Sequence, residues 1–471
     1  YMGNASGLNI NAGTGNVNFN NTVGGNKATG NITVNGAAVN ASNINIYNGG
    51  TLSVTNTAAS SISGVVSGGM ALTKAGVGTL TLTGNSTYTG TTTISAGAMS
   101  ATGSLNSGLS LTVSAGTTFV LGSDNTIASL SGSGDINLGS YTLTLSNANG
   151  TYSGVMSGTG GLTLTAGTLT LSGANTYSGT TTISGGTVIV TNNAGLGTAA
   201  GGTSVASGAT LDLHNVTVGT EAITLAGGTL KDVTSSLAGN ITLTADSTLI
   251  ATNVGDTLTL SGVISGSYGI TKSGAGTVVL SNANTYTGAT TISAGTLSVT
   301  GSLSNSTAVS VASGATYNVG ASDTIASLTG AGSVTLGSNT LTLANASGTY
   351  SGVMSGTGGL TVSGGTATLS GANTYTGATA IGSGATLALS TGGSIADSSA
   401  VTATGTLDIS GTTSGASIKS LAGAGYVTLG SKTLTLTAAN DTFSGVMSGT
   451  GGLTVSGGTA TLSGANTYTG A

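Results

Sequence analysis

The residues that could perform acid–base or nucleophilic chemistry are few. The sequence has one histidine, His214, which follows Asp212 by two residues in Leu211-Asp212-Leu213-His214. Strand alternation would place both side chains on one outward face, and a nearby serine would complete a Ser-His-Asp hydrolase site. However, no G-x-S-x-G elbow occurs at a strand-to-helix turn, and one histidine beside one aspartate is expected by chance. We therefore interpret Asp212 and His214 as a surface polar pair.

Acidic residues could instead form the paired carboxylates of a polysaccharide-cleaving enzyme. Only Asp232 has an adjacent cation, Lys231, and such a site needs more than one pair of this kind. Asp124 and Asp323 occupy nearly equivalent repeat positions beside corners, one residue out of step, which predicts Asx turns. The full set of acids is Asp124, Asp135, Asp212, Glu221, Asp232, Asp246, Asp256, Asp323, Asp397, Asp408 and Asp441.

The sequence contains no motif typical of a metal-binding or phosphate-binding site. Calcium repeats of the G-G-x-G-x-D type are absent, because the Gly-Gly pairs lead mostly into Thr or Leu. The Gly-rich segments are corners and not phosphate cradles, since no helix or GK[ST] follows them. We predict no catalytic residue, no metal site and no cofactor.

The elements that would position any site belong to a repeat. A Ser-Gly-Val-x-Ser-Gly string starts at five serines, at intervals of 90, 108, 90 and 93 residues, and a Ser/Asn-Thr-Tyr-[ST]-Gly string follows each copy. The first three intervals are close to multiples of about 18, which predicts an inner unit of roughly 18 residues, stretched in places to about 20. We predict that all five copies lie at equivalent corners on one side. The serines are Ser63, Ser153, Ser261, Ser351 and Ser444, and the tyrosines are Tyr88, Tyr177, Tyr286, Tyr375 and Tyr468.

One unit contains three short strands separated by Gly/Asn corners. In residues 168–190, Leu169 and Leu171 alternate with polar residues, Thr181-Thr182-Ile183 is a second strand, and Val188 alternates through a third. Inward Leu, Ile and Val would stack between coils, and outward Thr and Ser suit strands. The tyrosines could form an adhesive row, but we expect each to cover a corner or cap the core.

Composition supports an ordered, uncharged, all-β chain. Gly makes up 85 of 471 residues, charged residues only 4 %, and Pro, Cys and Trp are absent, whereas ordinary globular domains carry about 25 % charge. The net charge of −5 and the lack of a basic patch exclude nucleic acid as a partner. No apolar stretch reaches about 18 residues, so no transmembrane helix is expected. The lack of cysteine fits either the cytosol or a bacterial surface protein.

These observations predict a single parallel β-helix of roughly 22–26 coils. Residues 1–59 would be Asn/Gly-rich coils of the same solenoid, and residues 60–471 would carry the long-period repeat. The terminal text SGANTYTGA continues into another strand in the earlier copies, so we expect a segment of a longer polypeptide.

Residues 160–190 and 269–301 resemble the strand repeat of autotransporter passengers, and residues 206–218 resemble their linking coils. The resemblance covers residues from about 60 onward. It implies a right-handed parallel β-helix exposed on a Gram-negative cell surface, outside the outer membrane, after secretion through a C-terminal β-barrel that would anchor the parent chain. Many such proteins act in adhesion, aggregation or biofilm formation.

From this resemblance we expect a non-enzymatic surface solenoid that mediates adhesion or self-association. Its partners would be like rods packed laterally, or a host or glycan surface. Two alternatives remain open at this stage. One is a building segment of an extracellular filament, and the other is a polysaccharide-active β-helix enzyme, which would need convergent carboxylates in a cleft.

Overall fold

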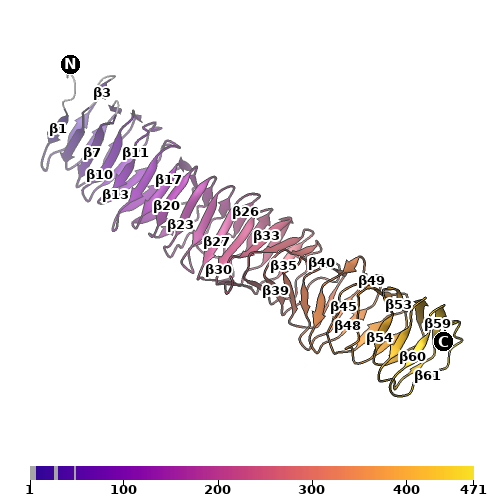
Figure 1. Ribbon diagram of the computed structural model, residues 1–471. Coiled ribbons are helices and arrows are strands. Elements are labelled where there is room, and N and C mark those ends of the chain that lie inside the picture. The colour runs from indigo at the N-terminus through magenta and orange to yellow at the C-terminus, as the bar shows by residue number, and fades with distance from the viewer. Residues whose placement is uncertain (1–6, 26–29, 47–48, 471) are drawn as a thin grey trace. The chain divides into compact units, whose positions relative to one another are not determined.

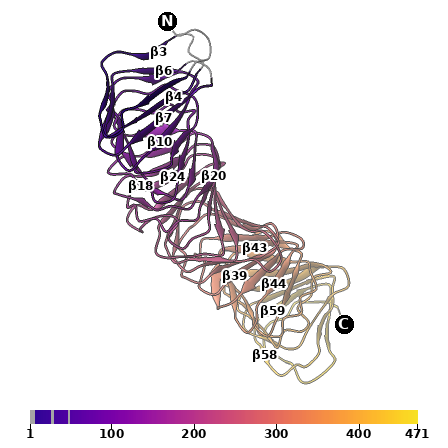
Figure 2. The same cartoon turned by 90° about the vertical axis from the view of Figure 1, so that its left-hand side faces the viewer.

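The computed structural model describes residues 7–25, 30–46 and 49–470, and these residues form strands and connecting turns with no helix among them. The described part therefore contains no helix that is long and apolar enough to cross a membrane. Two compact units, Tyr1–Leu230 and Lys231–Ala471, are described separately below as unit 1 and unit 2. Figures 1 and 2 show the strands of each unit stacked side by side.

Each turn of unit 1 contributes strands to up to three faces. In one turn, the first face receives β7 (Thr51–Asn56), the second β8 (Ser60–Ile62) and the third β9 (Val66–Ser67). The chain then returns to the first face as β10 (Ala71–Ala75), which pairs with β7 in parallel. Repetition of this path builds a parallel β-solenoid, as the sequence predicts.

The register of the strands fixes the length of a turn. In unit 1, Leu72 pairs with Thr92, Thr92 with Leu111, and Leu111 with Leu130, so successive turns take 20, 19 and 19 residues. The predicted inner unit of roughly 18 residues is therefore too short. Some turns are longer still, because Val188 pairs with Leu211, 23 residues later.

Alternation along the strands sorts side chains into a buried and an outward set. The buried set stacks in columns, since parallel strands in register place equivalent residues above one another. One such column on the third face of unit 1 consists of Leu145, Leu164, Ile183, Val205 and Leu225, all buried. Its strands are β19 (Leu143–Leu145), β22 (Leu162–Leu164), β24 (Thr181–Ile183), β26 (Thr203–Ala206) and β29 (Ile223–Ala226).

The described part of the Asn-rich N-terminal region follows the same plan. Strand β1 (Leu8–Asn11) pairs with β4 (Ile32–Gly36), and β4 pairs with β7, all in parallel. These turns are built from alternating Ile, Val and Asn, with the apolar side chains of β4 directed into the core.

Unit 2 has the same architecture. One turn consists of β33 (Ser247–Ala251) on the first face, β34 (Thr257–Leu260) on the second and β35 (Ile264–Gly266) on the third. The next turn begins at β36 (Ile270–Ser273), which pairs with β33 in parallel. Among the described residues, eleven strands of the first face lie wholly within each unit, and β30 (Thr229–Val233) includes the boundary between the units. This count agrees with the predicted total of roughly 22–26 coils.

The Ser-Gly-Val-x-Ser-Gly copies do not share a face, contrary to the prediction. In unit 1, the first copy forms β9 on the third face and the second forms β21 (Met156–Ser157) on the second face. In unit 2, successive copies form β35 on the third face, β47 (Val353–Ser355) on the second and β59 (Val446–Gly449) on the first. Within each unit, the chain from one copy to the next therefore makes five turns less one face.

Candidate functional site

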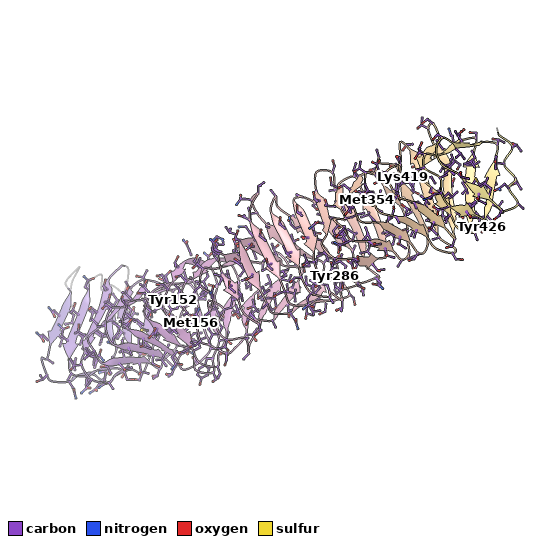
Figure 3. All side chains as sticks on the ribbon, turned by 90° about the horizontal axis from the view of Figure 1, so that it is seen from below. Tyr152, Met156, Tyr286, Met354, Lys419 and Tyr426 are labelled. Atoms are coloured by element: carbon purple, nitrogen blue, oxygen red, sulfur yellow. The ribbon has the colours of Figure 1, made fainter. Side chains whose placement is uncertain are left out.

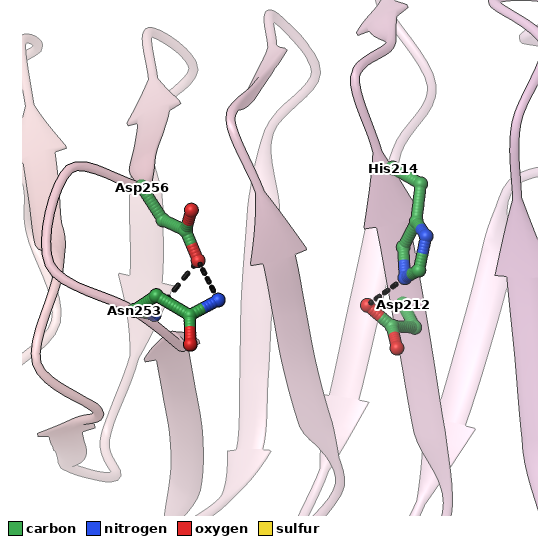
Figure 4. A network of polar contacts seen from close by, with 4 residues as sticks. All are labelled: Asp212, His214, Asn253 and Asp256. Carbon is green, nitrogen blue, oxygen red and sulfur yellow. Dashed lines mark hydrogen bonds and ion pairs between the residues drawn. The ribbon is translucent and has the colours of Figure 1, made fainter.

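The histidine and its neighbouring aspartate lie together, but they do not form a hydrolase site. Both come from β27 (Thr210–His214) on the first face of unit 1. His214 Nε2 is 3.1 Å from Asp212 Oδ1, with side-chain exposures of 34 % and 4 % (Figure 4). Asp212 is therefore buried, which corrects the prediction of a surface pair. The contact allows an ion pair when the histidine is protonated, and no hydroxyl hydrogen bond to His214 Nε2 occurs among the described residues.

Within the described residues, no group of three or more His, Cys, Asp or Glu side chains could hold a metal ion. Asp232 and its sequence neighbour Lys231 do not share a face, because Asp232 is buried whereas Lys231 is partly exposed. Burial raises the pKa of Asp232, and the charge of Asp256 raises it further. Asp256 itself shapes a corner by accepting hydrogen bonds from the backbone and side-chain nitrogens of Asn253 at 2.7 and 3.0 Å (Figure 4).

Asp124 and Asp323 have different roles, and neither forms the predicted Asx turn. Asp124 accepts a hydrogen bond from Thr142 N at 2.7 Å, one turn away. Asp323 is buried and accepts from Leu303 N of the preceding turn at 3.0 Å. In unit 1, Asn125 makes the corresponding contact to Leu105 N at 2.7 Å. The one-residue offset in the sequence is therefore a true difference in position.

Asp323 stands where the corresponding repeat in unit 1 has Asn125, and a second residue near it also differs between the two repeats. Tyr317 lies on β41 (Thr316–Val319) where the corresponding repeat in unit 1 has Phe119. Burial raises the pKa of Asp323, while its hydrogen bonds from Leu303 N and Thr324 N oppose that rise. Asp323 and Tyr317 are therefore both buried in the core.

Four of the five repeated tyrosines are core residues, in line with the prediction that each covers a corner or caps the core, whereas the fifth, Tyr468, is partly exposed. Tyr88, Tyr177, Tyr286 and Tyr375 are buried, and the hydroxyl of each pairs with the threonine hydroxyl four residues later. The oxygen–oxygen distances are 2.6, 2.5, 2.7 and 2.7 Å to Thr92, Thr181, Thr290 and Thr379. An adhesive row built from these four tyrosines is therefore wrong.

The two sequence motifs of each repeat are stacked on one another. Thr176 N and Tyr177 N both donate to Met156 O, at 2.8 and 3.1 Å. Met156 belongs to the Ser-Gly-Val-x-Ser-Gly copy one turn earlier, and Met354 is its counterpart in unit 2 (Figure 3). The motifs recur together because each copy of one forms the surface on which the other packs.

Lys74 and Lys272 are fully buried, which the sequence pattern did not predict. The Nζ of Lys74 donates to the carbonyls of Ala75, Gly76 and Ala96 at 3.0, 2.8 and 3.0 Å. Lys272 Nζ is held in the same way by three carbonyls at 2.9, 2.8 and 3.0 Å. Burial lowers the pKa of both lysines to about 8.

A local sequence signal accompanies these lysines. The corner that follows each of them, Lys-[Ala/Ser]-Gly-x-Gly-Thr, is one residue longer than Leu164-Thr165-Ala166-Gly167-Thr168, where an apolar residue takes the inward position. The longer corner supplies two of the carbonyls and the following turn supplies the third, Ala96 O or Ala294 O, so all three N–H groups of each ammonium are satisfied. The two lysines thus have a structural role, in which each ammonium holds corner carbonyls together by hydrogen bonds.

The family model for the passenger-associated-transport-repeat matches residues 72–101, 166–190, 270–299, 364–389 and 457–471, and each segment contains one of the repeated tyrosines. The adhesin BmaC autotransporter of Brucella suis biovar 1 (strain 1330) is 34 % identical over 375 residues, which cover 72 % of this chain and 10 % of that protein. The chain therefore spans about a tenth of the length of this relative. No solved structure gives a significant match.

Proposed function

The chain is an autotransporter passenger repeat protein, and we propose that it forms a cell-surface passenger segment that mediates adhesion or self-association. It would be displayed outside a Gram-negative cell. The name of the relative, an adhesin, supports this proposal and supports a non-enzymatic role. The contact partner would be a cell-surface glycan or another copy of the chain.

One structural observation carries the proposal: the outward side of the first face presents a long column of uncharged hydroxyl groups in each unit, which ends at Ile189 and Asp212 in unit 1 and at Ala388 and Asp408 in unit 2. In unit 1 this column is Thr33, Ser53, Thr73, Thr93, Thr112, Ser131, Thr151 and Thr170. Successive members are one strand spacing apart, about 4.8 Å. In unit 2 the corresponding column is Thr248, Thr271, Thr291, Ser310, Thr329, Thr349 and Thr368.

Such a face can bind by many weak contacts. Each hydroxyl both donates and accepts hydrogen bonds, so a polyhydroxylated or similarly polar surface finds partners without a fixed charge pattern. Only two hydroxyls of the unit 1 column, Thr112 and Ser131, pair with each other, at 3.1 Å. With 4 % charged residues in the chain, binding should depend weakly on salt.

Binding to cells, glycan arrays and immobilised copies of the chain tests the proposal. A charged variant, Thr93→Lys with Thr112→Lys, should reduce binding because it places two cations on neighbouring strands. Ser107→Lys is the matched control, since Ser107 lies exposed at a corner away from this column. Equal binding by all three proteins, or binding by the native chain that disappears between about 0.05 and about 1 M salt, would contradict the proposal.

A further inference from the structure

Each repeat ends one sheet of the solenoid. In unit 1, β9 and β21 are the last strands of their sheets, and in unit 2 the same holds for β35 and β47. All four strands are Ser-Gly-Val-x-Ser-Gly copies. A last strand leaves backbone N–H and C=O groups without a ladder partner, which is costly when the edge is buried and invites pairing with another strand.

The segment one turn later covers this edge without forming a strand. Above β21, residues 172–180 have no strand, and Asn175 occupies the position over Met156. Its Oδ1 accepts a hydrogen bond from Met156 N at 2.8 Å. Its Nδ2 donates to Gly195 O of the following turn at 2.7 Å. The side chain is buried, so it holds both contacts away from water.

The same arrangement recurs in unit 2. Asn284 accepts from Ile264 N at 3.0 Å and donates to Ser302 O at 3.0 Å. Asn373 accepts from Met354 N at 2.9 Å and donates to Ser394 O at 3.1 Å. In every case the side-chain amide connects three consecutive turns, whereas repeat arrays are usually coupled only between nearest neighbours.

We propose that Asn175, Asn284 and Asn373 are three-turn clamps that cap the internal sheet edge left by each repeat and set the threshold at which the solenoid opens there. The inference depends on the hydrogen-bond geometry alone and not on what the chain adheres to. Where the clamp is present, the edge strand and the two turns after it open together. Where it is absent, the edge opens by itself and becomes available to another strand.

The first repeat supplies a natural comparison. Ser86 occupies the position of the clamp asparagine in Asn85-Ser86-Thr87-Tyr88, over the edge strand β9. It is buried, and its Oγ has no hydrogen-bond partner among the described residues. A serine hydroxyl lies on a shorter side chain and cannot span to both neighbouring turns as an amide does. The repeat at β9 is therefore the unclamped member of the set.

A reciprocal pair of variants tests the inference by hydrogen exchange of the full 471-residue chain. Asn175→Ser should raise the exchange rate of the Met156 amide by about 10-fold to 100-fold, as expected for the loss of a buried hydrogen bond. Ser86→Asn should lower the exchange rate of peptides containing Val66. Asn147→Ala is the control, because Asn147 is exposed and lies outside the clamp.

Light scattering provides a second readout. Asn175→Ser should associate more readily than the native chain, because the uncapped edge of β21 can accept a strand. The inference is overturned if neither reciprocal variant changes exchange at its own edge strand. It is also overturned if Asn175→Ser accelerates exchange uniformly through unit 1, which would indicate a general loss of stability and not the release of one clamp.

Discussion

A charge placed in a buried column should open the solenoid locally and in a pH-dependent way. Ile183 is 0 % exposed and lies between Leu164 and Val205 in the third-face column of unit 1. Replacing it by aspartate removes its apolar contacts and places a carboxyl group where no ladder hydrogen bond is available to a side chain. The variant Ile183→Asp therefore tests whether the buried column excludes water.

The expected local destabilisation has three parts. Losing the buried isoleucine costs about 2 kcal/mol, and an unsatisfied neutral carboxyl costs about 1–3 kcal/mol more. Keeping that carboxyl protonated at pH 7, about 3 pH units above its ordinary pKa near 3.9, costs about 4 kcal/mol. Because the folded-state pKa is raised, this last part disappears as the pH falls toward about 4 and is fully present at neutral pH.

Hydrogen exchange of peptides from β24, corrected for the intrinsic effect of pH, measures the local opening. Ile183→Asp should be strongly deprotected at pH 7 and markedly less so near pH 4, whereas Ile183→Asn should show no such recovery. Thr182→Asp should be tolerated, because Thr182 lies on the same strand, faces outward and pairs with Thr163 and Ser204. Deprotection by Ile183→Asp that does not change with pH, or that matches Thr182→Asp, would show that the carboxylate reaches water and that the column is not sealed.

Two further predictions follow from buried groups. Burial lowers the pKa of Lys74 and Lys272 from 10.5 to about 8, so the folded chain binds fewer protons than the unfolded chain between these values and stability should rise with pH across that interval. Urea unfolding should show this rise, and the variant Lys74→Met with Lys272→Met should abolish it; an unchanged pH profile would refute the assignment. A Cβ on Gly154 would lie 1.8 Å from Gly134 O, so Gly154→Ala should lower thermal stability, whereas Gly219→Ala, with no atom within 4 Å, should not.

The class of fold could be predicted from the sequence because alternation has a direct physical meaning. Leu169 and Leu171 are two positions apart, as are Val188 and Val190, and all four side chains are buried. Inward apolar residues with outward Thr and Ser admit few structures other than stacked strands, once Pro is absent and Gly marks the corners. The strand at Thr181-Thr182-Ile183 was located for the same reason.

The length of a turn could not be predicted from the repeat interval. An interval of 90 residues divides evenly by 18, but it equally spans one face less than five turns of 19 or 20 residues. Only the hydrogen-bond register distinguishes these two turn lengths, because the strands of all three faces have the same alternating sequence pattern. The prediction that the motifs share a face failed through this ambiguity.

The polar residues illustrate a second limit. Asp212 stands on an outward position, yet it is buried because His214 and neighbouring strands cover it. Lys74 stands on an inward position, where a charge would normally be excluded, and its ammonium donates hydrogen bonds to two carbonyls of a lengthened corner and to one carbonyl of the next turn. Alternation predicts the direction of a side chain, whereas its burial and partners depend on corners whose path only the structure reveals.

The shift of successive motif copies to a different face also explains the length of the repeat. Each repeat interrupts one hydrogen-bonded ladder, and a repeat of whole turns would place every interruption on the same face. One face would then lack a continuous ladder at every repeat. Because the repeat falls one face short of five turns within each unit, successive interruptions move to a different face while the strands of other faces continue past them. Over the interrupted edges β21, β35 and β47, an asparagine side chain accepts the hydrogen bond that a further strand would have accepted. The repeat length and the clamp therefore address the same structural problem.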